Sequence, residues 1–356
     1  MRVVFHIARL GGGGAERVLV LLANYFACQG HTVFVVANKP YECEYSLDAA
    51  VKKMYLDSSD KDGVLERNLK RMGFIRNLCR NEKIDCLISF MAEPNIRSIV
   101  ACLGLKTKNI VSVRNDPNKE YPGKLLPIAR WLFRLADRVI LQTSQAKEVF
   151  KYLGDRAAII PNPVSSSFYD VVADPMSTRI VTAGRLEGQK NQELLIRAFA
   201  GVSSDYPETT LDIFGEGSLR SHLSGVADEL QIGERVIFHG RSSDMARELA
   251  DAGIFVLSSD YEGMPNALME ALAAGIPSIA TDCPCGGPAD LIDTGENGIL
   301  VPVGSIQGME DGLRALLLDV EARIRLSQGS KKSMEGYKTE KICKRWEEVV
   351  SECISG

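Results

Sequence analysis

The sequence has few histidines and no group of cysteines or histidines at metal-ligand spacing. Its four histidines, at positions 6, 31, 222 and 239, form no pair along the chain, and its nine cysteines include no C-x-x-C. Cys283 and Cys285 flank a proline without further partners. These absences argue against a zinc-binding module and a disulfide framework. An odd, scattered set of cysteines instead predicts reduced thiols in a cytosolic protein.

Long apolar runs and the common nucleotide fingerprints are also missing. No stretch approaches the ~20 apolar residues that a membrane-spanning helix needs. The opening MRVVFHIARLGGGG passes directly into glycines, which predicts a first strand rather than a signal peptide. The glycines do not form G-x-G-x-x-G, because Glu16 and Arg17 occupy the required place, and no Walker lysine follows. An NAD-dependent dehydrogenase is therefore the least favoured enzyme class.

The composition is that of a globular protein with a full core. The chain has 356 residues, of which 45% are hydrophobic and 25% charged, and its length predicts two domains. The net charge of −4 gives no sign of nucleic-acid binding. Residues 1–165 contain 25 Lys and Arg against 16 Asp and Glu, a net charge of +9, which leaves −13 for the remainder. A basic first half predicts an anionic surface or substrate for that half.

Short Val- and Ile-rich runs alternate with helical patterns along the chain, which predicts an α/β fold with parallel sheets. A Pro- and Ser-rich link near 161–176 separates two such series. We expect a first domain at 1–165, a second at 166–337, and a terminal helix at 338–356 that packs back on the first domain. The expected strands are 2–8, 32–37, 84–90, 109–114 and 138–143, then 178–184, 210–215, 235–240, 253–259, 277–281 and 298–301.

Ligands of open parallel sheets bind beyond the carboxyl ends of the strands, and the first strand is followed by four glycines. The segment 10-LGGGGAERV-18 leads into an amphipathic helix. Glycines there permit close approach of a ligand or of another backbone segment. A phosphate loop and a merely tight turn are equally compatible with this segment.

Two cations follow the first strand of the second domain, in 184-GRLEGQKNQELLIRA-198. Arg185 leaves the strand, and Lys190 precedes the next helix. Cations at a helix N-terminus oppose the helix dipole, and a bound anion would remove this conflict. We favour an anion site over solvated surface charge.

Two glutamates lie eight residues apart in 258-SSDYEGMPNALMEALAAGIP-277. Pro265 suits the first position of a helix. Glu262 precedes that helix, and Glu270 lies within it, away from the apolar face marked by Leu268. An acid near a helix start can simply stabilise the dipole, by ~0.3–1 kcal/mol, but Glu270 is too deep in the helix for that explanation. The positions of both glutamates would be explained if the helix N-terminus bound a phosphate and the carboxylates bound sugar hydroxyls.

Several motifs together resemble the retaining glycosyltransferase family 4. These motifs are GGGGAERV, IPNPV, GRLEGQKN, FGEGSLR, the two-glutamate segment, GGPADLI and ENGILVPVG. The resemblance implies the GT-B architecture, in which two facing Rossmann-like domains enclose an interdomain cleft. It also implies transfer of a sugar from a nucleotide diphosphate sugar, with UDP as the nucleotide, to a hydroxyl of a glycan or lipid-linked acceptor, with retention of anomeric configuration. Bacterial surface polysaccharide assembly is the expected setting.

The resemblance assigns a role to each matching residue. Arg185 and Lys190 would neutralise the diphosphate as catalytic groups, and Glu262 would act at the sugar. Glu270 would bind the ribose, and the region Phe238–Arg241 would border the base. The expected donor-binding residues are Gly12, Gly13, Gly14, Arg185, Lys190, Arg241, Glu262, Gly263, Met264, Pro265, Asn266, Ala267 and Glu270.

No cofactor and no metal are expected, because in this family arginine and lysine take the place of a metal ion. The DxD-like Asp60-Lys61-Asp62 does not follow an apolar strand and is interpreted as a helix cap. Two alternatives stay open. One is a nucleotide-sugar epimerase or hydrolase on the same fold, and the other is a non-catalytic nucleotide-sugar-binding protein.

One segment departs from the family pattern. Many relatives have a histidine after the strand near position 114, where this chain reads 111-VSVRNDPN-118. Arginine cannot act as a base at ordinary pH. Arg114, Asn115 and Asp116 are therefore candidate acceptor-binding residues, and Asp116 is also a candidate catalytic group.

Two basic segments of the first domain favour a membrane surface. Segment 61–83 has an apolar stripe among many Lys and Arg, and 124–138 repeats arginine every four residues beside Trp131. Basic amphipathic helices with an aromatic residue bind anionic lipid, although ordinary solvated helices show the same pattern. The expected location is cytoplasmic, with peripheral attachment to the inner face of the cell membrane as one option.

Overall fold

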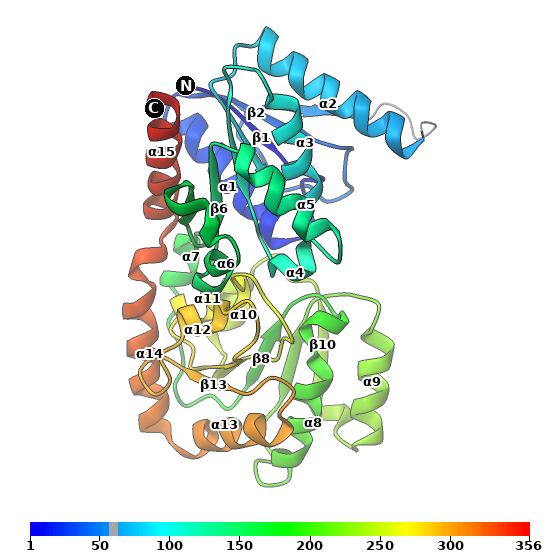
Figure 1. Cartoon of the computed structure of the whole chain (residues 1–356). Helices are drawn as coiled ribbons and strands as arrows, with labels where there is room; N and C mark the ends of the chain where they lie inside the picture. The colour runs from blue at the N-terminus through cyan, green and yellow to red at the C-terminus, as the bar shows by residue number, and fades with distance from the viewer. Residues whose placement is uncertain (57–62) are drawn as a thin grey trace. The chain divides into compact units, whose positions relative to one another are not determined.

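Two parallel sheets organise the chain in the structure, a computed structural model that describes residues 1–56 and 63–356 (Figure 1). Residues 1–163 and 339–356 form one unit, and residues 164–338 form the other. The expected divisions, at 165/166 and 337/338, differ from these by one or two residues. Each unit is described by itself below. The α/β architecture with parallel sheets agrees with the prediction.

The first unit contains a seven-stranded sheet of order β3-β2-β1-β4-β5-β6-β7. Every neighbouring pair is parallel. The strands are β1 (Arg2–His6), β2 (Thr32–Ala37), β3 (Lys52–Tyr55), β4 (Cys86–Phe90), β5 (Lys108–Ser112), β6 (Arg138–Leu141) and β7 (Ala157–Ile159). The helices are α1 (Gly14–Cys28), α2 (Val64–Asn81), α3 (Ala92–Cys102), α4 (Pro117–Glu120), α5 (Leu125–Leu132), α6 (Ser144–Val149) and α15 (Thr339–Ser355), with the short 3₁₀ turns η1 (Phe133–Leu135) and η2 (Lys151–Arg156).

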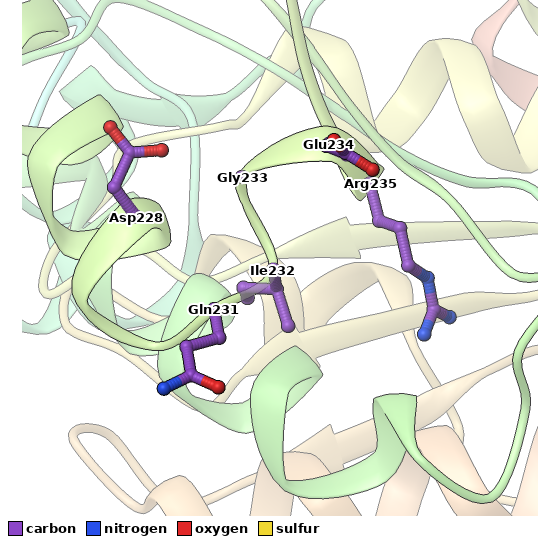
Figure 2. Close-up of a pocket in the computed structure, with 6 residues that line it drawn as sticks. All are labelled: Asp228, Gln231, Ile232, Gly233, Glu234 and Arg235. Carbon is purple, nitrogen blue, oxygen red and sulfur yellow. The ribbon is translucent and has the colours of Figure 1, made fainter.

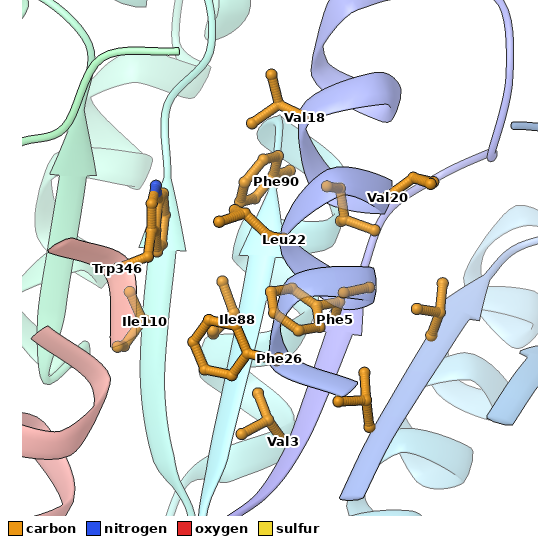
Figure 3. Close-up of a cluster of buried hydrophobic side chains, with 14 of the residues drawn as sticks. Val3, Phe5, Val18, Val20, Leu22, Phe26, Ile88, Phe90, Ile110 and Trp346 are labelled. Carbon is orange, nitrogen blue, oxygen red and sulfur yellow. The ribbon is translucent and has the colours of Figure 1, made fainter. Parts of the chain in front are cut away.

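The first sheet is buried on both faces because its side chains alternate between two apolar clusters. Val3 and Phe5 pack with α1 and α15, whereas Val4 packs on the opposite face with α2 and α3. Figure 3 shows the first of these clusters, in which Trp346 of α15 lies beside Phe90, with ring centroids 5.6 Å apart. The terminal helix therefore contributes to the core of the first unit.

The second unit contains a six-stranded parallel sheet of order β10-β9-β8-β11-β12-β13. The strands are β8 (Ile180–Ala183), β9 (Leu211–Phe214), β10 (Val236–Gly240), β11 (Ile254–Leu257), β12 (Ser278–Thr281) and β13 (Ile299–Val301). The helices are α7 (Ser166–Tyr169), α8 (Gln192–Ser203), α9 (Arg220–Glu229), α10 (Met245–Ala250), α11 (Asn266–Ala273), α12 (Gly287–Leu291), α13 (Ile306–Leu318) and α14 (Val320–Met334), with η3 (Gly188–Lys190), η4 (Gly233–Arg235) and η5 (Glu335–Tyr337).

The strand order of the second sheet reverses between β8 and β11, which are hydrogen-bonded neighbours. The connections from β8 and from β11 run to opposite sides of this point, so their loops separate above the sheet edge. A doubly wound sheet binds its ligand at such a switch point. The segments that follow β8 and β11 are those that contain Arg185, Lys190 and Glu262.

Candidate active site

Lys190 and Glu262 form an ion pair at the switch point of the second sheet. Lys190 ends η3, after β8, and Glu262 lies in the loop after β11. Their side chains are only 16% and 7% exposed. A buried carboxylate is costly unless it is paired and hydrogen-bonded, so the ion pair explains how Glu262 is accommodated without a ligand.

Further contacts hold the Glu262 carboxylate in place. The Ser259 hydroxyl donates to its Oε1 atom at 2.6 Å, and the Gln189 amide lies 3.4 Å from Oε2. The main chain of Glu262 also exchanges two hydrogen bonds with the segment after β12, to Pro284 O (2.6 Å) and from Cys285 N (2.7 Å). Three strand-end loops therefore hold Glu262, because those after β8 and β11 contact its carboxylate and the one after β12 contacts its main chain.

A thiol lies close to this carboxylate but is unsuited to nucleophilic chemistry. Burial, and then the charge of Glu262, raise the pKa of the Cys283 thiol to about 12. The thiolate is the reactive form of cysteine, and it is scarcely populated at neutral pH when the pKa is so high. Cys283 is therefore not a candidate nucleophile.

Helix α11 begins at Asn266, directly after Pro265, and no side chain caps it. The first N–H groups of an α-helix have no acceptor within the helix, and α11 starts at the end of the loop that contains Glu262. Glu270, in the middle of α11, is only 7% exposed. An uncapped helix start between two buried carboxylates is suited to an anion with hydroxyl groups on either side.

Glycines bring the strand-end loops of this unit into backbone contact. A Cβ atom at Gly287 would lie 1.8 Å from the Gly263 carbonyl oxygen, and one at Gly215 would lie 1.9 Å from the Gly184 oxygen. Neither position could hold a larger residue without movement of the main chain. The glycines of FGEGSLR and GGPADLI are thus explained by packing, which sets the position of the Glu262 loop.

Two other predicted donor residues of the second unit, Arg185 and Arg241, are more exposed than Lys190 and Glu262. Arg185 is exposed, and its Nη2 atom donates to Gln189 Oε1 at 3.3 Å. Gln189 thereby connects Arg185 to the Glu262 loop. Arg241 is exposed and directly follows β10, the edge strand, two strands away from β8.

The glycine loop of the first unit packs against its own chain. A Cβ at Gly11 would lie 2.0 Å from Cys43 O, and Gly12 has a φ of +89°. Glu16, in the first turn of α1, is buried, and its carboxylate lies over Gly13 and 3.2 Å from Arg9 Nε. These contacts account for the glycines as a tight turn. The predicted diphosphate contact of Gly12, Gly13 and Gly14 stays a prediction.

The candidate acceptor residues follow β5, and two of the three are buried. Arg114 is 8% exposed and Asp116 is 5% exposed. The Asp116 side chain caps α4 by accepting from Asn118 N at 3.0 Å. The backbone N–H of Arg114 and that of Asn115 both donate to Glu120, a residue that no sequence motif had indicated.

The pocket in Figure 2 lies between the end of α9 and the start of β10. It is therefore at the amino end of a strand of the second sheet, whereas the candidate site lies at the carboxyl ends of β8 and β11. Its lining residues are Asp228, Gln231, Ile232, Gly233, Glu234 and Arg235. The Arg235 guanidinium donates to the backbone oxygens of Ser203 (2.7 Å), Tyr206 (2.5 Å) and Thr209 (2.7 Å). Arg235 is therefore committed to the fold, and this pocket is unrelated to the strand-end residues.

The two basic segments expose large apolar side chains. Leu65 and Leu69 of α2 are 76% and 57% exposed, whereas Ile75 of the same stripe is fully buried. On α5, Ile128 and Trp131 are 52% and 60% exposed. Only the second half of the predicted α2 stripe thus packs on the core. In the described parts of the chain, no helix has both the length and the apolarity needed to cross a bilayer.

Within residues 1–56 and 63–356, no three His, Cys, Asp or Glu side chains gather as metal ligands would. The DxD-like Asp60-Lys61-Asp62, interpreted above as a helix cap, lies outside the described residues.

Comparison with known families and proteins agrees with the sequence motifs. A family model described as glycosyltransferase family 4 matches residues 12–168, and one described as glycosyl transferases group 1 matches residues 169–333. These ranges leave only the two ends of the chain unmatched.

Individual relatives match over nearly the whole chain. An uncharacterized glycosyltransferase of Haemophilus influenzae is 27% identical over 98% of this chain and 99% of its own. A Campylobacter jejuni α-1,4-N-acetyl-D-galactosaminyltransferase, named for a diphospho-undecaprenol-linked glycan, is 28% identical over 99% of both chains. The crystal structure of Anabaena HepE with UDP and glucose matches with a TM-score of 0.83 and 17% identity over 99% of both chains. The likeness to HepE establishes the GT-B fold, and the two family models establish that this chain belongs to the glycosyltransferases of family 4 and group 1.

Proposed function

We propose that this chain transfers a sugar from a UDP-sugar to a hydroxyl of a lipid-linked glycan, with retention of anomeric configuration, during assembly of a surface polysaccharide or glycan. The observation that carries the proposal is the Lys190–Glu262 ion pair beside the uncapped start of α11. A diphosphate is bound by cations and by a helix N-terminus, and a sugar needs hydrogen-bond acceptors. Lys190, Arg185, the start of α11 and the two carboxylates supply these groups on the carboxyl side of one sheet.

In this proposal, Lys190 and Arg185 neutralise the diphosphate as it departs. The N–H groups at the start of α11, from Asn266 and Ala267, bind its distal phosphate. Stabilising the charge that develops on a leaving group is the largest contribution that such a site can make to catalysis. No metal ion is required if the two cations supply this stabilisation.

Glu262 and Glu270 divide the remaining donor groups between them. Glu262 accepts hydrogen bonds from the transferred sugar and stabilises its positive charge as the glycosidic bond weakens. Glu270 accepts from the ribose hydroxyls. The acceptor hydroxyl attacks from the face that the diphosphate leaves, and a diphosphate oxygen takes its proton. The loop between Glu262 and α11, the helix that contains Glu270, consists of Gly263, Met264 and Pro265.

On the acceptor side, the proposal assigns binding to Arg114, Asn115 and Asp116 at the end of β5. The lipid-linked class of acceptor is suggested by the name of the Campylobacter relative and by the basic first unit. UDP is suggested by the ligand of HepE.

We also propose that the first unit attaches peripherally to anionic lipid through α2 and α5. Exposed Leu65, Leu69, Ile128 and Trp131 stand among arginines and lysines. Each basic residue near an anionic surface contributes about 1 kcal/mol, and exposed apolar side chains add burial in the interface. A polyprenyl acceptor would then be reached at the membrane surface.

Product analysis tests the proposed activity. The chain is incubated with a UDP-sugar, with and without a polyprenyl-diphosphate-linked N-acetylhexosamine, and UDP and the glycan product are quantified by chromatography. The proposal expects UDP release in step with glycan extension and an α-linked product from an α-linked donor. UDP release at an equal rate without acceptor indicates a hydrolase, and a changed donor sugar indicates an epimerase. Tight UDP binding without turnover of any donor indicates a non-catalytic protein.

A further inference from the structure

The carboxylate of Glu120, the last residue of α4, receives two hydrogen bonds from the main chain of the turn after β5. Its Oε2 atom accepts from the backbone N–H of Arg114 at 2.7 Å and of Asn115 at 2.9 Å. The N–H of Val113, one residue earlier, still bonds to Ile140 O in the neighbouring strand at 3.0 Å. Glu120 thus supplies acceptors where the sheet no longer does, and buried main-chain donors require such partners.

The turn held by Glu120 carries the Arg114 guanidinium. This group lies over the Phe90 ring, 4.5 Å from its centroid, and donates from Nη2 to Oδ1 of Asn162. Asn162 also accepts from Gln142 Nε2 at 2.6 Å. These residues end or follow β4, β5, β6 and β7, so four neighbouring strand ends meet at one buried cation.

The charge of Arg114 is not neutralised directly. No carboxylate among residues 1–56 and 63–356 forms an ion pair with its guanidinium, and both Arg114 Nε and Glu120 Oε1 are buried without a hydrogen-bond partner. Burial lowers the pKa of Arg114 to about 9 and raises the pKa of Glu120 to about 7. An incompletely paired buried cation is costly, and such groups are concentrated at functional sites.

We infer that Glu120 is a positioning residue for the acceptor, because its carboxylate fixes the turn that presents Arg114 and Asp116 at the end of β5. The inference rests on the proposed function, which puts the acceptor at Arg114, Asn115 and Asp116. Glu120 acts through these residues and contacts the main chain rather than the substrate.

The strength of the two hydrogen bonds that fix this turn depends on the charge of Glu120. An ionised carboxylate makes stronger, charge-assisted hydrogen bonds to N–H groups than a protonated acid does. Burial raises the pKa of Glu120, and the backbone N–H groups of Arg114 and Asn115 lower it. Among the described residues, the titratable and charged groups that act on Glu120 are the Tyr121 hydroxyl and the Arg114 guanidinium, which also lower this pKa. Acidification below neutral pH therefore loosens the turn.

Steady-state kinetics of the full chain test this role with Glu120→Gln and Glu120→Asp. The donor is UDP-N-acetylgalactosamine and the acceptor is a polyprenyl-diphosphate-linked N-acetylhexosamine. For the wild type, the acceptor KM should rise about tenfold between about pH 8 and pH 6 as charge-assisted hydrogen bonds weaken. Glu120→Gln should have the raised acceptor KM at both pH values and an unchanged donor KM, whereas Glu120→Asp should restore part of the pH dependence. Glu148→Gln, an exposed residue of the same unit, serves as the control.

A wild-type pH profile in Glu120→Gln, or an equal rise of donor and acceptor KM, would overturn the inference. Amide hydrogen exchange supplies a second readout that needs no turnover. The protection of the Arg114 and Asn115 amides should fall in Glu120→Gln but not in Glu148→Gln. Unchanged protection contradicts the inference itself, whereas lost protection without transfer to any acceptor contradicts the proposed function instead.

Discussion

The Lys190 ammonium group is paired with the Glu262 carboxylate, although the proposed function requires Lys190 to bind a diphosphate. A nucleotide must therefore compete with Glu262 for this cation. When the phosphate takes Lys190, the carboxylate loses its counter-charge beside the bound sugar, where positive charge develops during transfer. Ser259, whose hydroxyl donates to Glu262 at 2.6 Å, would keep the carboxylate in position through this exchange. Under the proposed function, donor binding thus prepares Glu262 to stabilise that charge.

Removal of the Glu270 carboxylate should weaken nucleotide binding. Glu270→Ala loses the acceptor for the ribose hydroxyls, and hydrogen bonds to a charged group contribute roughly 1.5–3 kcal/mol, so the UDP Kd should rise at least about tenfold. Titration calorimetry of the two proteins measures the change. Glu229→Ala, on α9 away from the strand-end loops, should leave the Kd unchanged. Equal effects of the two substitutions on the UDP Kd would show that Glu270 does not bind the nucleotide.

A methyl group at Gly287 should disturb the Glu262 loop. The Cβ atom of Gly287→Ala would lie 1.8 Å from Gly263 O, so the backbone must move, and we expect turnover to fall by on the order of a hundredfold because small displacements of catalytic groups are costly. Gly225→Ala, on α9 with nothing within 4 Å of its Cβ, should keep full activity and gain roughly 0.5–1 kcal/mol of stability. Full activity in Gly287→Ala would show that the loop tolerates rearrangement.

Membrane attachment should depend on the exposed apolar side chains of α2. Leu65→Ser with Leu69→Ser removes two exposed leucines, and sedimentation with anionic vesicles should fall about tenfold or more from the lost apolar burial. Leu318→Ser, an equally exposed leucine of the second unit, should have no effect. Wild-type binding should weaken with salt and be absent on neutral vesicles. Equal binding to neutral and anionic vesicles would contradict the electrostatic part of the proposal.

His6 should make stability depend on pH. Burial, and then the charge of Arg97, lower the pKa of His6 to about 3. Below pH 6.5 the unfolded chain binds a proton that the folded chain excludes, so stability is lost as the pH falls from about 6.5 toward 3, by up to about 1.4 kcal/mol per pH unit. Urea unfolding of wild type and His6→Gln at several pH values should show their difference shrinking in acid. A constant difference would show that His6 becomes protonated in the folded protein.

The strands that the sequence predicted are those with continuous apolar runs. Lys52–Tyr55 and Ala157–Ile159 were missed, because β3 and β7 are short edge strands that begin with two charged or two small residues. An edge strand forms because it pairs with the neighbouring strand, and the pattern of apolar residues along the chain does not predict this pairing.

The main residues of the candidate site could also be predicted, because the carboxyl ends of parallel strands converge at one sheet edge. Ser259, Gln189 and Glu120 could not, because each acts through a contact made only in the folded chain. Leu65 and Leu69 continue the apolar stripe of buried Ile75, yet the core does not reach them. The sequence pattern of an amphipathic helix does not say where its partner surface ends.

If Lys190 binds a nucleotide diphosphate in competition with Glu262, the UDP Kd of the wild type, Lys190→Ala and Glu262→Gln should show it directly when measured by calorimetry at one salt concentration. Lys190→Ala should bind UDP at least about tenfold more weakly, because a charge-assisted phosphate contact is lost. Glu262→Gln, which frees Lys190, should bind UDP as tightly as the wild type or more tightly and yet fail to turn over donor. Weakened UDP binding in Glu262→Gln, or unchanged binding in Lys190→Ala, would contradict this competition.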